Sequence, residues 1–412
     1  MSRTLASLPA GSRITDYISL GVVTKVFPPE RIRAALAASG KQSVRQRDLP
    51  AQVVVYYVIS LSLYMSSSYR EVLRCLLEGI QWLVKPSATA IKVTGHSGIS
   101  QARTRLGWEP LRLLHDELVK PIAVTATKGA WYRDRRLVSI DGSTLDVADE
   151  KSNDEAFGRP GASRGTSGYP KIRFVSLLEN GTHVLFGSQM ADYATSEIAL
   201  AKSVLPSLSK GMLCLADRGF FGFQMWKQAA ATGADLLWRL KKDIGLACEK
   251  RLPDGSYLSR IYPTKQDRKR GKNGVVVRVI DYRLEGVDGA EPLYRLATTM
   301  LGHELSPATE LAALYHERWE IETTFDELKT HLRGARIVLR SKTPDLVRQE
   351  FYGLLMAHFA VRSFMHEAAL NADEDPDKLS FLHAVRVVRR KMSTSGAIPP
   401  SGPQSLPENS PG

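Results

Sequence analysis

Two aspartates that each follow a short apolar run are the residues of this sequence best placed to do chemistry. Asp141 comes directly after the run 137–140, and Asp217 comes directly after the run 212–216. We expect both runs to be neighbouring strands, so that the two carboxylates meet at one edge of a sheet. Like charges held this close repel each other, and the arrangement becomes favourable when divalent cations bridge them. Mg²⁺ keeps several coordination positions for water and phosphate oxygens, so the pair indicates phosphodiester chemistry.

A third acid lies in a predicted helix nearer the C-terminus, within the stretch 315–329. At ~100° per residue, four polar side chains of this stretch fall within an arc of roughly 60°, namely Tyr315, Arg318, Glu322 and Lys329. An acid, a guanidinium, an ammonium and a phenol on one stripe can complete a metal site and hold adjoining phosphates. The helical wheel does not exclude Asp326 as the acid, and such a stripe is also typical of a solvated helix face with i,i+4 ion pairs.

Several other kinds of active site lose support because their sequence patterns are absent. The chain contains no GxGxxG, GxxxxGK[ST] or HExxH motif. This disfavours phosphate-loop nucleotide binding and zinc peptidases. A lone Asp before glycine is an ordinary turn, so the ordered pair of aspartates carries more weight than either residue.

Composition and charge narrow the class of protein. The 412 residues are 43% hydrophobic and 24% charged, as in an ordinary folded protein. Their net charge of +13 favours a polyanionic partner such as nucleic acid over a merely basic surface. Three cysteines without CxxC spacing support neither a disulfide framework nor a zinc ribbon. No apolar stretch reaches the ~20 residues that cross a bilayer, and residues 1–16 lack a signal core, so we expect a cytoplasmic protein that does not bind membranes.

The first part of the chain is predicted to be helical. Apolar residues recur at helical spacing from residue 18 to about 123. Residues 99–106 and 110–118, separated by Gly107, have the pattern of a helix-turn-helix whose Gln101, Arg103 and Arg105 would face DNA. A plain pair of antiparallel helices packed on the core explains the same pattern equally well.

The middle of the chain predicts an α/β domain. Strands are expected at 137–140, 171–178, 183–190, 212–216 and 234–240, with helices at 196–205 and 222–232. Three strands followed by two helix–strand units are the order of a ribonuclease-H-like core, in which crossover helices join an antiparallel meander to parallel strands. The predicted fold class is therefore α/β, preceded by an all-α N-terminal domain and followed by C-terminal helices.

A β-rich insertion interrupts this core between residues 241 and about 291. Alternating valines at 275, 277 and 279 predict a β-hairpin subdomain, and its basic tip 265–272 includes Arg268, Lys269 and Arg270. That density of charge suits either a phosphate backbone or a solvated loop. Further helices are expected at 307–333 and 343–370, and the Pro/Ser/Gly-rich residues from 393 onward predict a disordered tail.

These motifs resemble those of the DDE transposases of the insertion-sequence-four type. The polar stripe matches the family's Tyr-x2-Arg-x3-Glu-x6-Lys fingerprint, residues 140–144 and 215–220 resemble its two Asp motifs, and 157–160 resembles the loop after the first. The helical stretch from residue 18 to about 80 also resembles the family's N-terminal domain. The resemblance implies that Asp141, Asp217 and Glu322 form a catalytic triad that binds two Mg²⁺ or Mn²⁺ ions.

The resemblance also implies which residues contact DNA. Tyr315, Arg318 and Lys329 would hold phosphates near the transferred end. Several family members cut DNA through a hairpin intermediate, whose flipped base needs an aromatic side chain to stack on. Tyr294 and Trp238, near the boundaries of the insertion, are the aromatic candidates, with Tyr294 slightly favoured.

The predicted function is a DNA transposase that cuts at terminal inverted repeats, transfers the strands to target DNA and assembles as a homodimer on paired DNA ends. A non-catalytic DNA-binding protein, either an inactivated copy or a regulator, is the first alternative. A structural endonuclease or ribonuclease of the same fold is another, but it has no need of the polar stripe. The predicted divisions are a helical domain (1–125), the first part of the core (126–240), the insertion (241–300), the core helix with Glu322 (301–340), C-terminal helices (341–391) and a tail (392–412).

Overall fold

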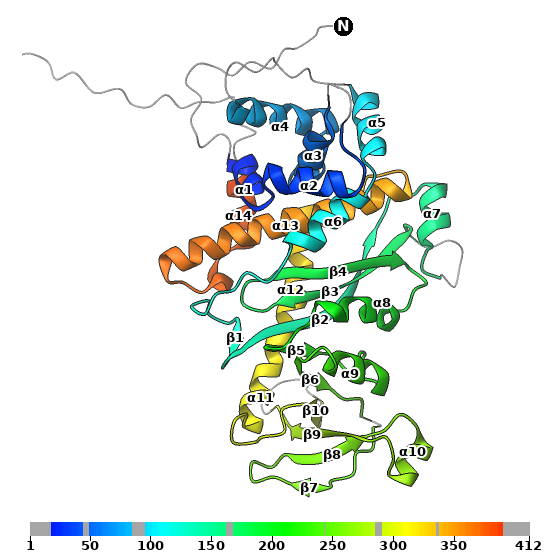
Figure 1. Ribbon diagram of the computed structural model, residues 1–412, viewed down its shortest axis with the longest axis vertical. Coiled ribbons are helices and arrows are strands. Elements are labelled where there is room, and N and C mark those ends of the chain that lie inside the picture. Colours follow the sequence, from blue (N-terminus) through cyan, green and yellow to red (C-terminus); the bar gives the residue numbers. More distant parts are fainter. Residues whose placement is uncertain are drawn as a thin grey trace, which may run out of the picture.

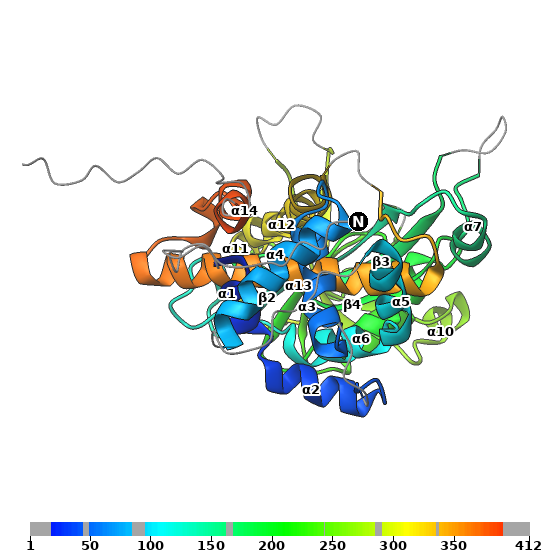
Figure 2. The ribbon, with the colours of Figure 1, turned by 90° about the horizontal axis from the view of Figure 1, so that it is seen from above.

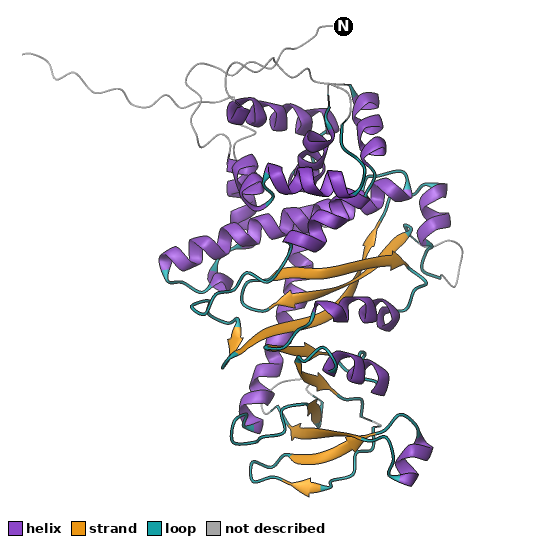
Figure 3. Ribbon diagram, viewed as in Figure 1, coloured by secondary structure: helices purple, strands orange, loops and turns teal. Residues whose placement is uncertain are grey.

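The fold has three levels along its long axis: helices at the N-terminal end, a mixed sheet in the middle and the strands of the insertion at the far end (Figures 1 and 3). This computed structural model describes residues 18–43, 49–84, 95–161, 168–242, 244–284, 291–334 and 338–389. The predicted disordered tail lies outside the described residues.

The ten strands found in the described residues belong to one continuous sheet. Its order is β4-β3-β2-β5-β6-β10-β9-β8-β7, with β1 paired to β2. The strands are β1 (Trp131–Tyr132), β2 (Arg135–Asp146), β3 (Lys171–Glu179), β4 (Val184–Asp192), β5 (Met212–Ala216), β6 (Asp235–Arg239), β7 (Lys250–Arg251), β8 (Tyr257–Ile261), β9 (Val275–Tyr282) and β10 (Tyr294–Thr298).

The helices cover both faces of the sheet and form the N-terminal level. In chain order they are α1 (Ile18–Val26), α2 (Pro29–Ala38), α3 (Ala51–Leu63), α4 (Tyr69–Val84), α5 (His96–Leu106), α6 (Glu109–Leu118), α7 (Lys151–Phe157), α8 (Glu197–Val204), α9 (Phe223–Ala230), α10 (Lys265–Arg270), α11 (Ala308–Leu314), α12 (Glu320–Asp326), α13 (Pro344–Ala372) and α14 (Phe381–Arg389). None of these helices is long and apolar enough to cross a bilayer.

The ribonuclease-H-like core is confirmed by the pairing of the first strands. β2, β3 and β4 form an antiparallel meander, and β5 and β6 join it in parallel, first beside β2 and then beside β5. α8 and α9 connect β4 to β5 and β5 to β6, as crossover connections between parallel strands require. The apolar runs that predicted these strands are buried on both faces, as expected for the centre of a covered sheet.

The strands of the insertion extend this sheet. β10 pairs antiparallel with β6, and β9, β8 and β7 follow outward from it. The predicted β-hairpin is present as the antiparallel pair β8 and β9, and it continues the core sheet instead of forming a sheet of its own. Without β10, β6 would be an edge strand with unpaired backbone NH and carbonyl groups, and β10 forms hydrogen bonds with these groups.

α13 separates the N-terminal helices from the sheet. Seen from above, α3 crosses α13 near the middle of the molecule (Figure 2). Every side chain of α3 from Val54 to Leu63 is buried, so α3 lies in the core of the N-terminal level. The two helices approach closely at Gly353, where an added Cβ would lie 2.8 Å from Val58 Cγ1 and 2.9 Å from the Val58 carbonyl oxygen.

Replacing Gly353 with alanine should destabilise the protein. Alanine is normally better than glycine inside a helix by about 0.5–1 kcal/mol, but here the new methyl group meets the backbone of α3. We expect a net loss of about 1–3 kcal/mol, measured as a lower midpoint of thermal or urea unfolding. Gly21 in α1 is the matched control, because an added Cβ there meets nothing within 4 Å. An unchanged midpoint for Gly353→Ala would contradict the close approach of the two helices.

Candidate active site

The end of a parallel strand pair brings the two predicted aspartates together. The parallel pairing of β2 with β5 ends at Ile140 and Ala216, and Asp141 and Asp217 are the next residues of each chain segment. One expectation is corrected here, because β2 does not end before Asp141 but continues to Asp146 beside β3. Asp141 therefore lies where β2 leaves its parallel partner.

Neighbouring residues of β2 face opposite sides of the sheet, because side chains alternate along a strand. Leu137 packs in a cluster with residues of α11, and Asp141, four residues on, points the same way and accepts a hydrogen bond from Arg318. Gly142 faces the other side, where a Cβ built on it would point at Glu197 of α8. At Asp141, the helix that carries Arg318 therefore lies on one face of the sheet and α8 lies on the other.

The helix that carries Glu322 changes its pitch along its length. α11 is followed by a 3₁₀ segment over Tyr315–Trp319, then by α12 and by a π-helical segment over Glu327–Gly334. The helix expected at 307–333 is present, but it is not the straight α-helix assumed for the polar stripe. The 3₁₀ segment lies directly before α12, which carries Glu322, and the π-helical segment lies directly after it.

A buried guanidinium links the acid of this helix to the acid of β2. The Arg318 side chain is 8% exposed and lies 3.4 Å from Asp141 Oδ2 and 3.1 Å from Glu322 Oε1. Glu322 itself is 46% exposed. Asp141 and Glu322 thus contact the same guanidinium from two different elements.

The two other residues of the stripe lie on the same helix in different environments. Tyr315 is buried and donates a hydrogen bond of 3.3 Å to the carbonyl of Ala216, the residue directly before Asp217. Its hydroxyl thus fixes the end of β5, and contact between Tyr315 and DNA stays a prediction. Lys329 is half-buried in the π-helical segment, and burial together with Arg333 lowers its pKa.

Acidic and basic side chains line a cleft at this edge of the sheet. The cleft has a volume of about 540 Å³ and is lined by Asp141, Glu197, Asp217, Arg218, Gly219, Phe220, Lys241 and Lys242. Burial raises the pKa of Asp141 to about 6, and the charges of Glu197 and Asp217 act in the same direction. Carboxylate oxygens are the donors that Mg²⁺ and Mn²⁺ prefer, so this set of side chains fits a hard divalent cation.

Glu197 is the acid of the cleft that sequence reasoning missed. It is the first residue of α8, and the Ser196 side chain caps this helix by accepting a hydrogen bond from the backbone NH of Ala199. A capped helix start with an acid in its first turn is common in proteins, so the sequence gives no sign that this acid reaches the cleft.

The aromatic candidates are found in contrasting settings. Trp238 is fully buried and packs edge-on against Trp226, so the prediction that it stacks on a flipped base is wrong. Tyr294 is half-buried, stacks on Tyr282 and lies beneath the guanidinium of Arg239. Trp319, which was missed, directly follows Arg318, is 56% exposed and has the Arg318 guanidinium 5.1 Å from the centre of its ring.

The basic tip of the insertion is a short helix. α10 begins at Lys265, after Thr264, whose side chain accepts a hydrogen bond from the backbone NH of Asp267. It ends at Arg270 and is followed by Gly271, which adopts φ +62°. Its residues Arg268, Lys269 and Arg270 are exposed. The predicted cluster is thus presented by an ordered element, with its charges directed to solvent.

The possible helix-turn-helix packs largely on the core. α5 and α6 flank Gly107 as expected, but Arg103 is buried and donates hydrogen bonds to Gln349 and Ser341. The prediction that Arg103 faces DNA is therefore wrong. Gln101 and Arg105 are exposed on the same helix.

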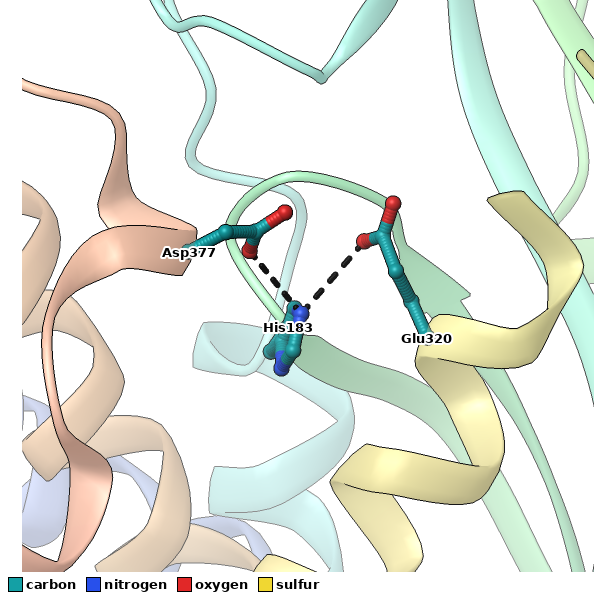
Figure 4. A group of neighbouring side chains, drawn as sticks. All are labelled: His183, Glu320 and Asp377. Carbon is teal, nitrogen blue, oxygen red and sulfur yellow. Dashed lines mark ion pairs between the residues drawn. The ribbon is translucent and has the colours of Figure 1, made fainter. Parts of the chain in front are cut away.

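A buried ionic network fixes the other side of the helix that carries Glu322. Figure 4 shows His183 between two carboxylates, with its Nε2 atom 2.9 Å from Asp377 Oδ1 and 3.5 Å from Glu320 Oε2. On the opposite side of the ring, Glu327 Oε1 lies 3.3 Å from His183 Nδ1. Glu327 also accepts hydrogen bonds from Arg362 of α13.

This network differs chemically from the cleft. Among the described residues, His183, Glu320 and Asp377 place ligand atoms within 4.8 Å of one another, close enough to share an ion. Burial and Arg362 lower the pKa of His183, but hydrogen bonds with Asp377 and Glu327 outweigh them and raise it to about 9. A protonated imidazole cannot bind a metal, and Mg²⁺ prefers oxygen ligands. The cleft is therefore the better candidate for the divalent cation.

Comparison with known proteins identifies two matching family models. Residues 17–116 match the N-terminal domain of insertion element 4 transposases, and residues 132–360 match the transposase DDE domain. The chain is 28% identical over 388 residues to the transposase InsG of insertion sequence element IS4 from Escherichia coli K12, covering 92% of this chain and 84% of InsG.

More distant similarities complete this comparison. The putative transposase InsZ from Escherichia coli K12 is 26% identical over 225 residues, which cover 54% of this chain and 72% of InsZ. Among solved structures, a piggyBac transposase synaptic complex with hairpin DNA aligns with a TM-score of 0.46 and 11% identity, over 94% of this chain and 84% of that chain. That structural similarity is too loose to add to the assignment of the fold.

Binding of a divalent cation in the cleft should strengthen as the pH rises through about 6. The pKa of Asp141 is raised to about 6, so below this pH a cation must compete with a proton for the carboxylate. We expect the affinity for Mn²⁺ to fall by about tenfold per pH unit below that point, measured by calorimetric titration from about pH 5 to pH 8. The Asp141→Asn variant should bind weakly and show no such step. An affinity that does not change with pH would contradict this assignment.

Proposed function

Because the chain belongs to the DDE transposases of the insertion element 4 type, metal-dependent enzymes that cut DNA and transfer its strands, we propose that Asp141, Asp217 and Glu322 are its catalytic triad. The observation that carries this proposal is the geometry at the sheet edge. Asp141 and Asp217 line one cleft, and Arg318 joins Glu322 to Asp141. Asp141 and Asp217 thus meet at the cleft, and Glu322 reaches Asp141 through Arg318 from a helix that is distant in the sequence.

We infer that the triad holds two Mg²⁺ or Mn²⁺ ions. When bound, such ions lower the pKa of water and stabilise charge on phosphoryl oxygens. The protein contributes the ionised carboxylates and their positions. The hydrogen bond from Tyr315 to Ala216 fixes the backbone directly before Asp217, and that aspartate in turn accepts a hydrogen bond from the backbone NH of Gly219.

Cationic side chains beside the triad suit a DNA backbone. Arg218 and Lys242 lie at the cleft and are held by ion pairs of 3.1 Å and 3.3 Å with Glu291 at the base of the insertion. We propose that Arg318 and Lys329 hold phosphates at the reacting DNA end. The exposed cations of α10 would then contact the DNA farther from the cleft.

Assembly and base recognition extend the same proposal. We propose that the protein cuts at terminal inverted repeats, works as a homodimer on paired DNA ends and acts in the cytoplasm. Tyr294 remains a candidate for stacking on a flipped base, and the exposed ring of Trp319 beside Arg318 is a second candidate.

Removing one charge from the triad should abolish DNA cleavage. Glu322→Gln keeps the shape of the side chain but removes a ligand for the cations, so we expect the rate to fall by about 10³-fold or more. The assay measures Mg²⁺- or Mn²⁺-dependent cleavage of a DNA fragment that carries the terminal repeats flanking this reading frame. Asp141→Asn and Asp217→Asn should behave in the same way.

The charge-matched control is Glu155→Gln on α7. Glu155 is exposed and pairs with Lys151 at 3.8 Å, so its loss should leave cleavage unchanged. If the wild type and the triad variants all bind the fragment and none cuts it, the catalytic proposal fails. The non-catalytic DNA-binding alternative would then take its place.

Neutralising α10 should weaken DNA binding in a salt-dependent way. If Arg268, Lys269 and Arg270 each contact a phosphate, the triple alanine variant should reduce the slope of log K against log salt by up to about 2–3. Fluorescence anisotropy with a duplex of unrelated sequence, at several salt concentrations, measures this slope. An unchanged slope would show that α10 is only a solvated helix.

A further inference from the structure

A fourth acid approaches the proposed triad from the opposite face of the sheet. Asp141 points toward the helix of Arg318, whereas Gly142 points toward α8. A Cβ atom built on Gly142 would lie 2.0 Å from Glu197 Oε1 and 2.8 Å from Glu197 Cδ. The carboxylate of Glu197 therefore occupies the space that any larger residue at position 142 would need.

Glu197 reaches the same cleft as the two aspartates. It lines the cleft together with Asp141 and Asp217. The charge of Glu197 raises the pKa of Asp141, and the charge of Asp217 raises the pKa of Glu197. In the described part of the chain, no cationic side chain forms an ion pair with Glu197. An acid brought this close to two others is favourable when a divalent cation is shared among them.

We propose that Glu197 is a fourth carboxylate of the divalent-cation site. It binds the cation from the α8 face, opposite to Glu322. Gly142 is the residue that makes this approach possible, because it leaves room for the Glu197 carboxylate beside β2. The inference rests on the proposed triad, since it adds a ligand to the same site.

Glu197 could instead serve only as a counter-charge to the cationic side chains beside it. Glu197 also lines a second hollow of about 390 Å³ with Lys171, Arg173 and Tyr193. Arg173 opposes the rise in the pKa of Glu197 that burial causes. If Glu197 served only as a counter-charge to these cations, its loss would not change cation binding at the triad.

Binding of Mn²⁺ to the full-length protein without DNA separates these roles. Free Mn²⁺ is measured by electron paramagnetic resonance for the wild type and for Glu197→Gln, with Glu155→Gln as the charge-matched control. We expect the Mn²⁺ affinity of Glu197→Gln to fall at least about tenfold, as for the loss of an inner ligand, and that of the control to stay within about twofold. DNA cleavage by Glu197→Gln in Mg²⁺ should fall in parallel.

The triad variants show which proposal fails if the result differs. If Asp141→Asn and Asp217→Asn lose Mn²⁺ binding but Glu197→Gln keeps it within about twofold, the role of Glu197 is overturned and the triad stands. If none of the three variants changes Mn²⁺ binding, the cation site itself is misplaced and both proposals are overturned.

Gly142→Ala tests the same contact without altering an acid. Gly142 does not adopt a positive φ, so alanine fits its backbone and the effect is confined to the space taken from Glu197. We expect Gly142→Ala to weaken Mn²⁺ binding about as much as Glu197→Ala, and the double variant to be no weaker than Glu197→Ala alone. Additive losses would show that the two residues act separately and would overturn the proposal. Circular dichroism of each variant confirms that it is folded.

Discussion

Mutual repulsion of carboxylates at one sheet edge is the constraint around which this molecule is built. Asp141, Asp217 and Glu197 share a cleft, and burial already raises the pKa of Asp141. Holding like charges together costs free energy, and carboxylates on flexible loops would move apart to lower this cost. Here the acids are placed by paired strands and packed helices, and the buried guanidinium of Arg318 offsets part of the repulsion between Asp141 and Glu322.

The helix that carries Arg318 is in turn held at both ends of its irregular segment. On the side of the cleft, Tyr315 donates its hydrogen bond to the end of β5. On the far side, Glu327 accepts hydrogen bonds from Arg362 and lies 3.3 Å from His183 and from His358. A buried carboxylate with three cationic or polar partners is costly to leave unpaired, so the network opposes any rotation of the helix.

Much of this arrangement could be predicted from local pattern. The apolar runs before Asp141 and Asp217 identified the strands, and the order of elements identified the core. Local pattern failed where a residue depends on a distant contact. Glu197 lies in the cleft where Gly142 leaves space for its carboxylate, and Arg103 turns inward toward acceptors on Gln349 and Ser341. Helical periodicity likewise cannot show a change of pitch that packing imposes.

The way the insertion joins the sheet has an evolutionary consequence. Leu296 of β10 pairs with Arg239 of β6, so the chain leaves the core and returns to it at adjacent positions. Segments whose two ends meet in a hydrogen-bonded pair can gain or lose residues between those ends without displacing the elements on either side. The intervening strands and α10 could therefore diverge in length and charge among descendants of this gene, while the helix bearing Glu322 kept its place. The surface charge of the insertion and the geometry of the core were thereby left free to change at different speeds.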